Sequence, residues 1–192
     1  MSGNRLLALT SVLFLPLFAC RNARPPDEAS ASTIEGGSAM SLAVTTTALS
    51  PGGAIPKSYT CDGADTSPDL SWSGAPAGVQ SFALIADDPD APVGTWTHWL
   101  IWNIPAQSTG LPKGVPKVET LDEGTRQGRN NFRRIGYGGP CPPQGKAHRY
   151  FFKVYALDAK LDLNAGATKE ELERAIKGHV MAQGELMGKY GR

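Results

Sequence analysis

Two histidines stand next to proline-rich loops, and these residues are the ones in the chain best suited to binding chemistry. His98 follows the segment 87–92, Asp-Asp-Pro-Asp-Ala-Pro, and His148 follows the segment 138–145, Gly-Gly-Pro-Cys-Pro-Pro-Gln-Gly. Proline fixes its own φ angle and restrains the residue before it, so both loops can hold the rim of a pocket rigid. A rigid rim loses little entropy when a ligand binds.

Hydrogen-bond donors are concentrated around these loops. The two imidazoles, the Tyr150 hydroxyl and the loop amides together suit a phosphate or a carboxylate. Asp88 would not bind an anion while ionised, but it could orient a histidine and favour the protonated form of that histidine. Taken singly, His98 and His148 are more typical of hydrogen-bonded core histidines between aromatic strands. Their shared loop context instead favours a small, preformed anion-binding pocket.

The elements that must position these side chains are β-strands. Residues 96–103 are apolar on both faces of an alternating pattern, which is typical of a central strand packed between two layers. Residues 148–156 alternate too, and their more apolar face begins at His148. Weaker strand patterns occur at 42–49 and 81–86, with Gly- and Pro-rich turns between the strands. Short strands separated by such turns predict a mainly β sandwich.

One helix is expected near the C-terminus. Thr168 and Glu171 have the spacing of a capping box, in which each side chain satisfies a free backbone N–H group. An apolar stripe at helical spacing follows, made of Leu172, Ala175, Ile176 and then His179 and Val180. Glu173 and Lys177 are spaced as a surface ion pair. We expect this helix to pack on the sheet, with His179 as a packing residue and not a ligand.

The first twenty residues resemble a bacterial lipoprotein signal peptide. Arg5 precedes an apolar stretch at 6–18, and its 13 residues are too few for the roughly 20 that span a bilayer. The stretch leads into Leu-Phe-Ala-Cys at 17–20, which resembles a lipobox, so we expect cleavage before Cys20 and lipidation of Cys20. An ordinary signal peptide with an incidental cysteine is the alternative. The lipid would anchor the exported chain in a bacterial cell envelope, facing the periplasm.

The rest of the chain divides into a tether and one domain. Residues 21–41 have no strand or helix period, which predicts a flexible tether, and the domain then covers residues 42–192. The net charge is only +1, so we expect no nucleic-acid partner. In an oxidising compartment, Cys61 and Cys141 would tend to form a disulfide. Two free thiols near the pocket are the alternative.

Several motifs together resemble the signature of the phosphatidylethanolamine-binding protein family. The motifs that carry the resemblance are Asp88–Pro92, Trp96–His98, Gly138–Pro143 and His148–Tyr150. Three further segments resemble the bacterial Raf-kinase-inhibitor-like branch of that family, namely Tyr59–Gly63, Ser67–Pro68 and Arg129–Phe132. The resemblance extends from Leu42 to Tyr190, and the order and spacing of the motifs make it specific.

The resemblance implies a two-sheet antiparallel sandwich with a C-terminal helix beside a pocket for phosphate-like head groups. It also implies a cis peptide between Ala91 and Pro92. The family's ligand-binding positions fall here on Asp88, Pro92, Trp96, His98, Cys141, Pro142, His148 and Tyr150. Two departures from many eukaryotic members are Thr97 before His98, where those have a second histidine, and Cys141, where those have glycine. Both departures resemble the bacterial branch.

These observations favour a binding module over an enzyme. The expected ligand is a small anion, such as phosphate or a phosphoethanolamine-like group, and no cofactor or metal is expected. A regulator or inhibitor of a protein partner, such as a hydrolase or a kinase, is the alternative. Cys141 and His148 could serve as a nucleophile and a base, but a disulfide to Cys61 would remove that thiol. The chain also has no Gly-x-Ser-x-Gly or His-Glu-x-x-His motif.

Overall fold

The structure, a computed structural model, describes residues 40–192. The expected signal peptide with Cys20, and the expected tether as far as residue 39, lie outside the described residues. Met40 and Ser41, which the sequence assigns to the end of the tether, form a short strand, β1. Within the described range no helix has the length and apolar character needed to cross a membrane.

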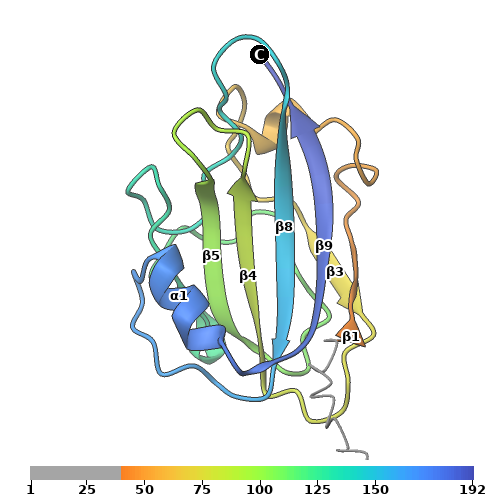
Figure 1. The fold of residues 1–192 in the computed structure, drawn as a ribbon, viewed down its shortest axis with the longest axis vertical. Helices are drawn as coiled ribbons and strands as arrows, with labels where there is room; N and C mark the ends of the chain where they lie inside the picture. Colours follow the sequence, from red (N-terminus) through yellow and green to blue (C-terminus); the bar gives the residue numbers. More distant parts are fainter. Residues whose placement is uncertain (1–39) are drawn as a thin grey trace, which may run out of the picture. The chain divides into compact units, whose positions relative to one another are not determined.

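The described residues form two β-sheets and one short α-helix (Figure 1). The strands are β1 (Met40–Ser41), β2 (Ala43–Thr45), β3 (Leu70–Ser73), β4 (Ser81–Asp88), β5 (Trp96–Pro105), β6 (Gly110–Leu111), β7 (Arg126–Gln127), β8 (His148–Leu157) and β9 (Val180–Tyr190). The helix is α1 (Lys169–Ile176), and two 3₁₀ turns are η1 (Lys57–Tyr59) and η2 (Asp122–Gly124). The mainly β sandwich expected from the sequence is therefore confirmed.

The larger sheet has the strand order β1-β9-β8-β4-β5-β7, and the smaller sheet has the order β2-β3-β6. Within residues 40–192, neighbouring strands run antiparallel except for β1, which pairs in parallel with β9. Because β4 runs antiparallel to both β5 and β8, its last residues lie beside the first residues of those two strands. Asp88 pairs with Trp96, and Asp87 pairs with Phe151. The two predicted loops and both pocket histidines thus meet at one end of the larger sheet.

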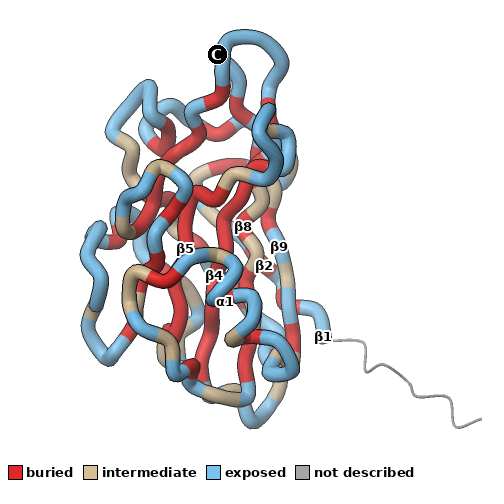
Figure 2. Tube along the Cα trace, turned by 60° about the vertical axis from the view of Figure 1, so that its left-hand side comes forward, coloured by how far each residue is buried: buried red, intermediate tan, exposed pale blue. Residues whose placement is uncertain are grey.

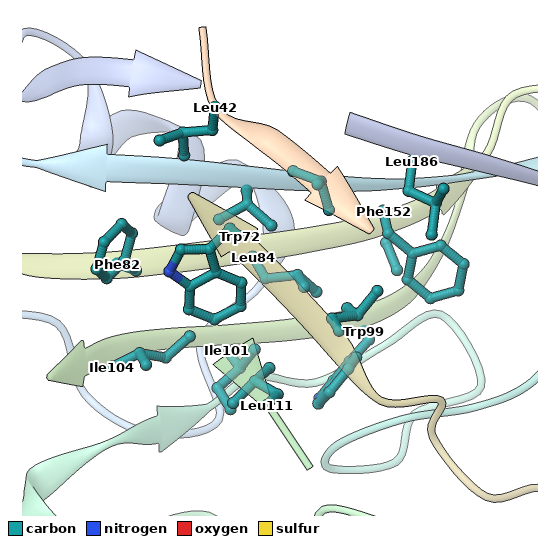
Figure 3. Packing of buried hydrophobic residues seen from close by; sticks show 14 of the residues in the cluster. Leu42, Trp72, Phe82, Leu84, Trp99, Ile101, Ile104, Leu111, Phe152 and Leu186 are labelled. Carbon is teal, nitrogen blue, oxygen red and sulfur yellow. The ribbon is translucent and has the colours of Figure 1, made fainter. Parts of the chain in front are cut away.

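Two apolar layers bury the central strands from both sides. Between the sheets, Leu84, Trp99 and Phe152 of the larger sheet pack with Trp72 of the smaller one (Figure 3). On the outer face, Ile85, Leu100 and Trp102 of the larger sheet pack against Leu172 and Ile176 of α1. Every residue of β4 is buried, and a continuous buried trace runs along β4 and β5 (Figure 2). The expectation that residues 96–103 form a strand packed between two layers is confirmed.

The capping box at the start of α1 is present, but the helix is shorter than the sequence suggested. The Thr168 side chain accepts from the Glu171 backbone, and the Glu171 side chain accepts from the Thr168 backbone. The helix stops at Ile176 because Lys177 leaves the helical region and Gly178 adopts a φ of +87°, a common way for a helix to end.

The expectation that the stripe continues through His179 and Val180 is therefore wrong. Val180 begins β9, and His179 is exposed and paired with Asp158 at 2.7 Å. The expected pair between Glu173 and Lys177 is replaced by one between Lys169 and Glu173 at 3.6 Å.

A disulfide joins Cys61 to Cys141, the cysteine pair expected to form one. The two residues are 80 positions apart, and their Cα atoms are 5.4 Å apart. The Cys61 backbone N–H also donates to the Pro140 carbonyl, at 3.1 Å. The bond therefore connects the loop after η1 to the loop before β8, which carries the Gly138–Pro143 motif.

Replacing both Cys61 and Cys141 with serine should lower the free energy of unfolding by about 4 kcal/mol, because the bond closes a long loop in the unfolded chain. Urea unfolding of the oxidised wild type and of the double variant measures this difference. Wild type assayed in a thiol reductant serves as the control and should match the variant. Equal unfolding midpoints for oxidised wild type and variant would contradict the prediction.

Candidate functional site

A cavity of about 190 Å³ lies at the end of the larger sheet where β4 ends and β5 and β8 begin. The loops beyond these strand ends gather near the C-terminus (Figure 1). The cavity is lined by Asp88, Ala91, Pro92, Val93, Trp96, His98, Phe132, Cys141, Pro142, Pro143 and His148. The structure thus brings together seven of the eight residues expected to bind the ligand, all except Tyr150. The helix expected beside the pocket packs on the outer face of the sheet, and none of its residues lines the cavity.

Asp88 holds the imidazole of His148 in place. His148 Nδ1 lies 2.7 Å from Asp88 Oδ2, and both side chains are buried. The other carboxylate oxygen, Oδ1, accepts from the Asp90 backbone N–H at 2.8 Å. With both oxygens engaged, the carboxylate accepts the Nδ1–H group and leaves Nε2 as the ring nitrogen available to a ligand.

The partner of the His98 ring is a backbone carbonyl and not a carboxylate. Its Nδ1 lies 2.6 Å from the Gly138 carbonyl, and because a carbonyl only accepts, Nδ1 must carry the proton. Burial lowers the pKa of His98, while the hydrogen bond to Gly138 and the charge of Asp88 act in the opposite direction without cancelling that effect. His98 is therefore neutral at neutral pH, and its Nε2 is a hydrogen-bond acceptor.

The Gly138–Gly139 backbone must pass close to η1 to reach His98. A Cβ atom on Gly139 would lie 2.4 Å from the Tyr59 carbonyl oxygen, so no larger residue fits without moving the chain. The Gly139 N–H group donates to Asp65 at 2.6 Å, and Gly138 N–H donates to the His98 carbonyl at 2.9 Å. These contacts fix the carbonyl that sets the tautomer of His98.

Two buried donors at the site have no hydrogen-bond partner in the described part of the chain. Tyr150 lies behind the cavity, with its ring edge-to-face with His98 at 5.2 Å between centroids. Burial raises the pKa of Tyr150 well above its ordinary value, so its hydroxyl stays protonated. Among residues 40–192, neither the Tyr150 hydroxyl nor Trp96 Nε1 has a hydrogen-bond partner. A buried donor left unpaired costs about 1–3 kcal/mol, and Trp96 lines the cavity, where a ligand could accept from it.

An ion pair holds the loop between β4 and β5 against β8. Asp90 receives two hydrogen bonds from the Arg149 guanidinium, at 2.7 and 2.9 Å, and one from the Arg149 backbone at 2.9 Å. These bonds hold the pKa of Asp90 well below its usual range. The loop then turns through a Gly94 N–H to Ala91 carbonyl bond of 3.1 Å. The expected cis peptide before Pro92 is wrong, since this turn closes with a trans bond and residues 40–192 contain no cis peptide.

Four lining residues were not assigned from the sequence: Ala91, Val93, Phe132 and Pro143. Phe132 matters most, because its ring meets both Trp96 and His98 with centroids 5.4 Å apart. It belongs to the segment 129–132, which resembles the family but has no recognisable strand or loop signal that places it at a pocket. Within the described range, no three His, Cys, Asp or Glu side chains are grouped as ligands for a metal ion.

The comparisons with known proteins agree with this fold. The family model of the phosphatidylethanolamine-binding protein matches residues 45–191. A UPF0098 protein of Methanothermobacter thermautotrophicus is 53% identical over 147 residues, which cover 77% of this chain and 97% of that protein. The crystal structure of Escherichia coli YbcL has a TM-score of 0.74 at 37% identity, covering 79% of this chain and 98% of that one. A family homologue from Chlamydia trachomatis, CT736, has a TM-score of 0.72 at 40% identity, with coverages of 79% and 98%.

The chain belongs to the phosphatidylethanolamine-binding protein family. Within that family it falls in the branch of bacterial and archaeal proteins that includes the UPF0098 proteins and YbcL. The resemblance seen in the sequence motifs is confirmed.

The low pKa of His98 predicts a specific pH dependence of stability. In the unfolded chain the pKa is near 6.5, so between that pH and the lower pKa of the folded state the unfolded chain binds up to one more proton than the folded chain. The free energy of unfolding should therefore fall as the pH drops through this value. His98→Asn keeps a donor for Gly138 and cannot titrate. Between pH 7.5 and 5, urea unfolding should show a larger loss for wild type than for the variant, and parallel curves would contradict the assignment.

Proposed function

We propose that this protein binds a small phosphate-bearing ligand in the cavity between Asp88, His98 and His148. The carrying observation is the mixture of hydrogen-bonding groups that converge there. Trp96 Nε1 is a buried donor without a partner among residues 40–192, and His98 Nε2 is an acceptor because Nδ1 is occupied by Gly138. His148 Nε2 adds a donor whenever that ring is protonated.

This mixture suits a phosphate monoester better than a simple carboxylate. A phosphate monoester has a second pKa near 6, so close to neutral pH it offers several acceptor oxygens and, in its monoanion, one O–H donor. The donor can meet His98 Nε2, while the acceptors can meet Trp96 and His148. A carboxylate anion has no O–H group, so its oxygen and His98 Nε2 would be two acceptors facing each other without a hydrogen between them.

Binding without catalysis is part of the same proposal. Cys141, the candidate nucleophile that lines the cavity together with His148, has its sulfur bonded to Cys61. The rigid rim also supports binding, since the Asp90–Arg149 ion pair and the disulfide hold two of its loops before any ligand arrives.

We also propose that the chain is exported and anchored in a bacterial cell envelope by a lipid on Cys20. Cys20 lies outside the described residues, so the proposal stands on the signal-peptide pattern and the disulfide. Cys61 and Cys141 are both exposed, and an exposed disulfide persists in an oxidising compartment rather than in a reducing cytosol.

Isothermal titration of the full-length chain carrying Cys20→Ser with phosphoethanolamine tests the binding proposal. Saturable binding is expected. His148→Ala and His98→Ala should each weaken it by about tenfold or more, the effect of losing a hydrogen bond to a charged group. His179→Ala removes an exposed histidine that lines no part of the cavity and is the matched control, with unchanged affinity expected. Equal affinity in wild type and both pocket variants would reject the proposal.

Expression of wild type and Cys20→Ser in a bacterium tests the anchor. The wild type should sediment with membranes and dissolve only in detergent, and mass spectrometry should find acyl chains on its N-terminal residue. The variant should carry no acyl chain. A wild type that stays soluble and unacylated would contradict the proposal.

A further inference from the structure

A second, smaller cavity adjoins the proposed phosphate site. Its volume is about 110 Å³. Phe132 and Cys141 line both cavities, so the two share a wall. The rest of the smaller cavity is formed by Cys61, Asp65, Arg134 and the backbone at 138–139. No residue of this set other than Cys141 was expected to bind a ligand.

Arg134 is the charged residue of this second cavity whose side chain has no partner among residues 40–192. Asp65 is already engaged, since Lys117 Nζ lies 2.7 Å from its Oδ2 and the Gly139 N–H group donates to its Oδ1 at 2.6 Å. The exposed Arg134 side chain makes no hydrogen bond or ion pair with any residue in the range 40–192. The cavity therefore offers a guanidinium that no residue in the range 40–192 engages, and its planar donors match a carboxylate.

Arg134 is carried on a loop whose position is fixed. The Asn130 side chain donates to the Gly136 carbonyl at 2.9 Å and accepts from the Arg134 backbone N–H at 3.1 Å. The next residue, Asn131, donates its backbone N–H to the Thr97 carbonyl at 3.0 Å, beside His98. The segment that places Phe132 against the larger cavity therefore also fixes the backbone position of Arg134.

We propose that the second cavity is a carboxylate subsite, so that the ligand is a small phosphorylated compound that also bears a carboxylate, of which phosphoserine is the simplest example. This inference rests on the proposed function, because the phosphate is taken to occupy the larger cavity. The ligand spans the wall formed by Phe132 and Cys141, with its phosphate near His98 and its carboxylate at Arg134.

Phosphoserine and phosphoethanolamine form a matched pair for the test, because they differ only by the carboxylate. Titration calorimetry on full-length Cys20→Ser protein should show that phosphoserine binds about two- to fivefold more tightly, the effect of one exposed ion pair. Adding Arg134→Gln should abolish this ratio and leave phosphoethanolamine affinity unchanged. Adding Arg133→Gln instead removes a neighbouring exposed arginine that lines neither cavity, and it should leave the ratio intact.

Two results would overturn the subsite while leaving the phosphate site standing: equal affinities for the two compounds in the parent protein, or an equal loss of the ratio in the Arg133 and Arg134 variants. Failure of both compounds to bind would overturn the proposed function and the subsite together.

Glycerophosphoserine, the soluble head group of a serine phospholipid, distinguishes the source of the ligand. Tighter binding of phosphoserine supports a phosphomonoester ligand. Tighter binding of glycerophosphoserine, a phosphodiester without an O–H group, would contradict the donor proposed for His98 Nε2 and assign the site to lipid head groups.

Discussion

Two neighbouring carboxylates at the buried end of β4 constrain both the fold and the site. Asp87 and Asp88 are only 2% and 3% exposed, and a buried charge is costly unless it is paired and hydrogen-bonded. Asp87 meets Lys153 and Lys169 at 3.2 and 2.9 Å, which connects the strand to the start of α1 on the outer face. Asp88 meets His148 on the side of the cavity. The end of β4 therefore holds α1 through Asp87 and holds His148 through Asp88.

The two pocket histidines acquire different properties because their Nδ1 partners differ. A carboxylate holds His148, whereas a neutral carbonyl holds His98 in an apolar setting with Phe132 and Tyr150 around its ring. The proposed site thus combines an acceptor with donors, a combination that favours a phosphate monoester over a carboxylate. The carboxylate specificity that we infer for the adjoining cavity comes from a separate residue, Arg134, on the same loop as Phe132. The two proposals therefore predict that phosphate and carboxylate recognition can be separated by mutation.

Sequence patterns predicted the parts of this structure that depend on local rules. Two-faced apolar alternation identified β5, the capping box identified the start of α1, and the cysteine pair identified the disulfide. The strand β9 was missed because Gly184 and Gly188 interrupt its alternation. In addition, His179 and Val180 continue the spacing of the apolar stripe of α1, although β9 begins at Val180. Phe132 was missed as a lining residue because a loop residue reaches a pocket through contacts distant in sequence. Tyr150 packs against His98 and does not line the cavity. Sequence alternation predicts the strand face on which a side chain lies, but not how deep it lies.

The central claim is that His98 and His148 both present Nε2 to a phosphate, with His98 as an acceptor and His148 as a donor when its ring is protonated. Long-range proton–nitrogen NMR of ¹⁵N-labelled imidazoles measures both the tautomers and their response to inorganic phosphate. The account predicts that His98 carries its proton on Nδ1 at neutral pH, that the Nε2 signals of His98 and His148 shift as phosphate is added, and that His179 does not respond. A His98 proton on Nε2, or pocket signals that phosphate leaves unchanged, would contradict it.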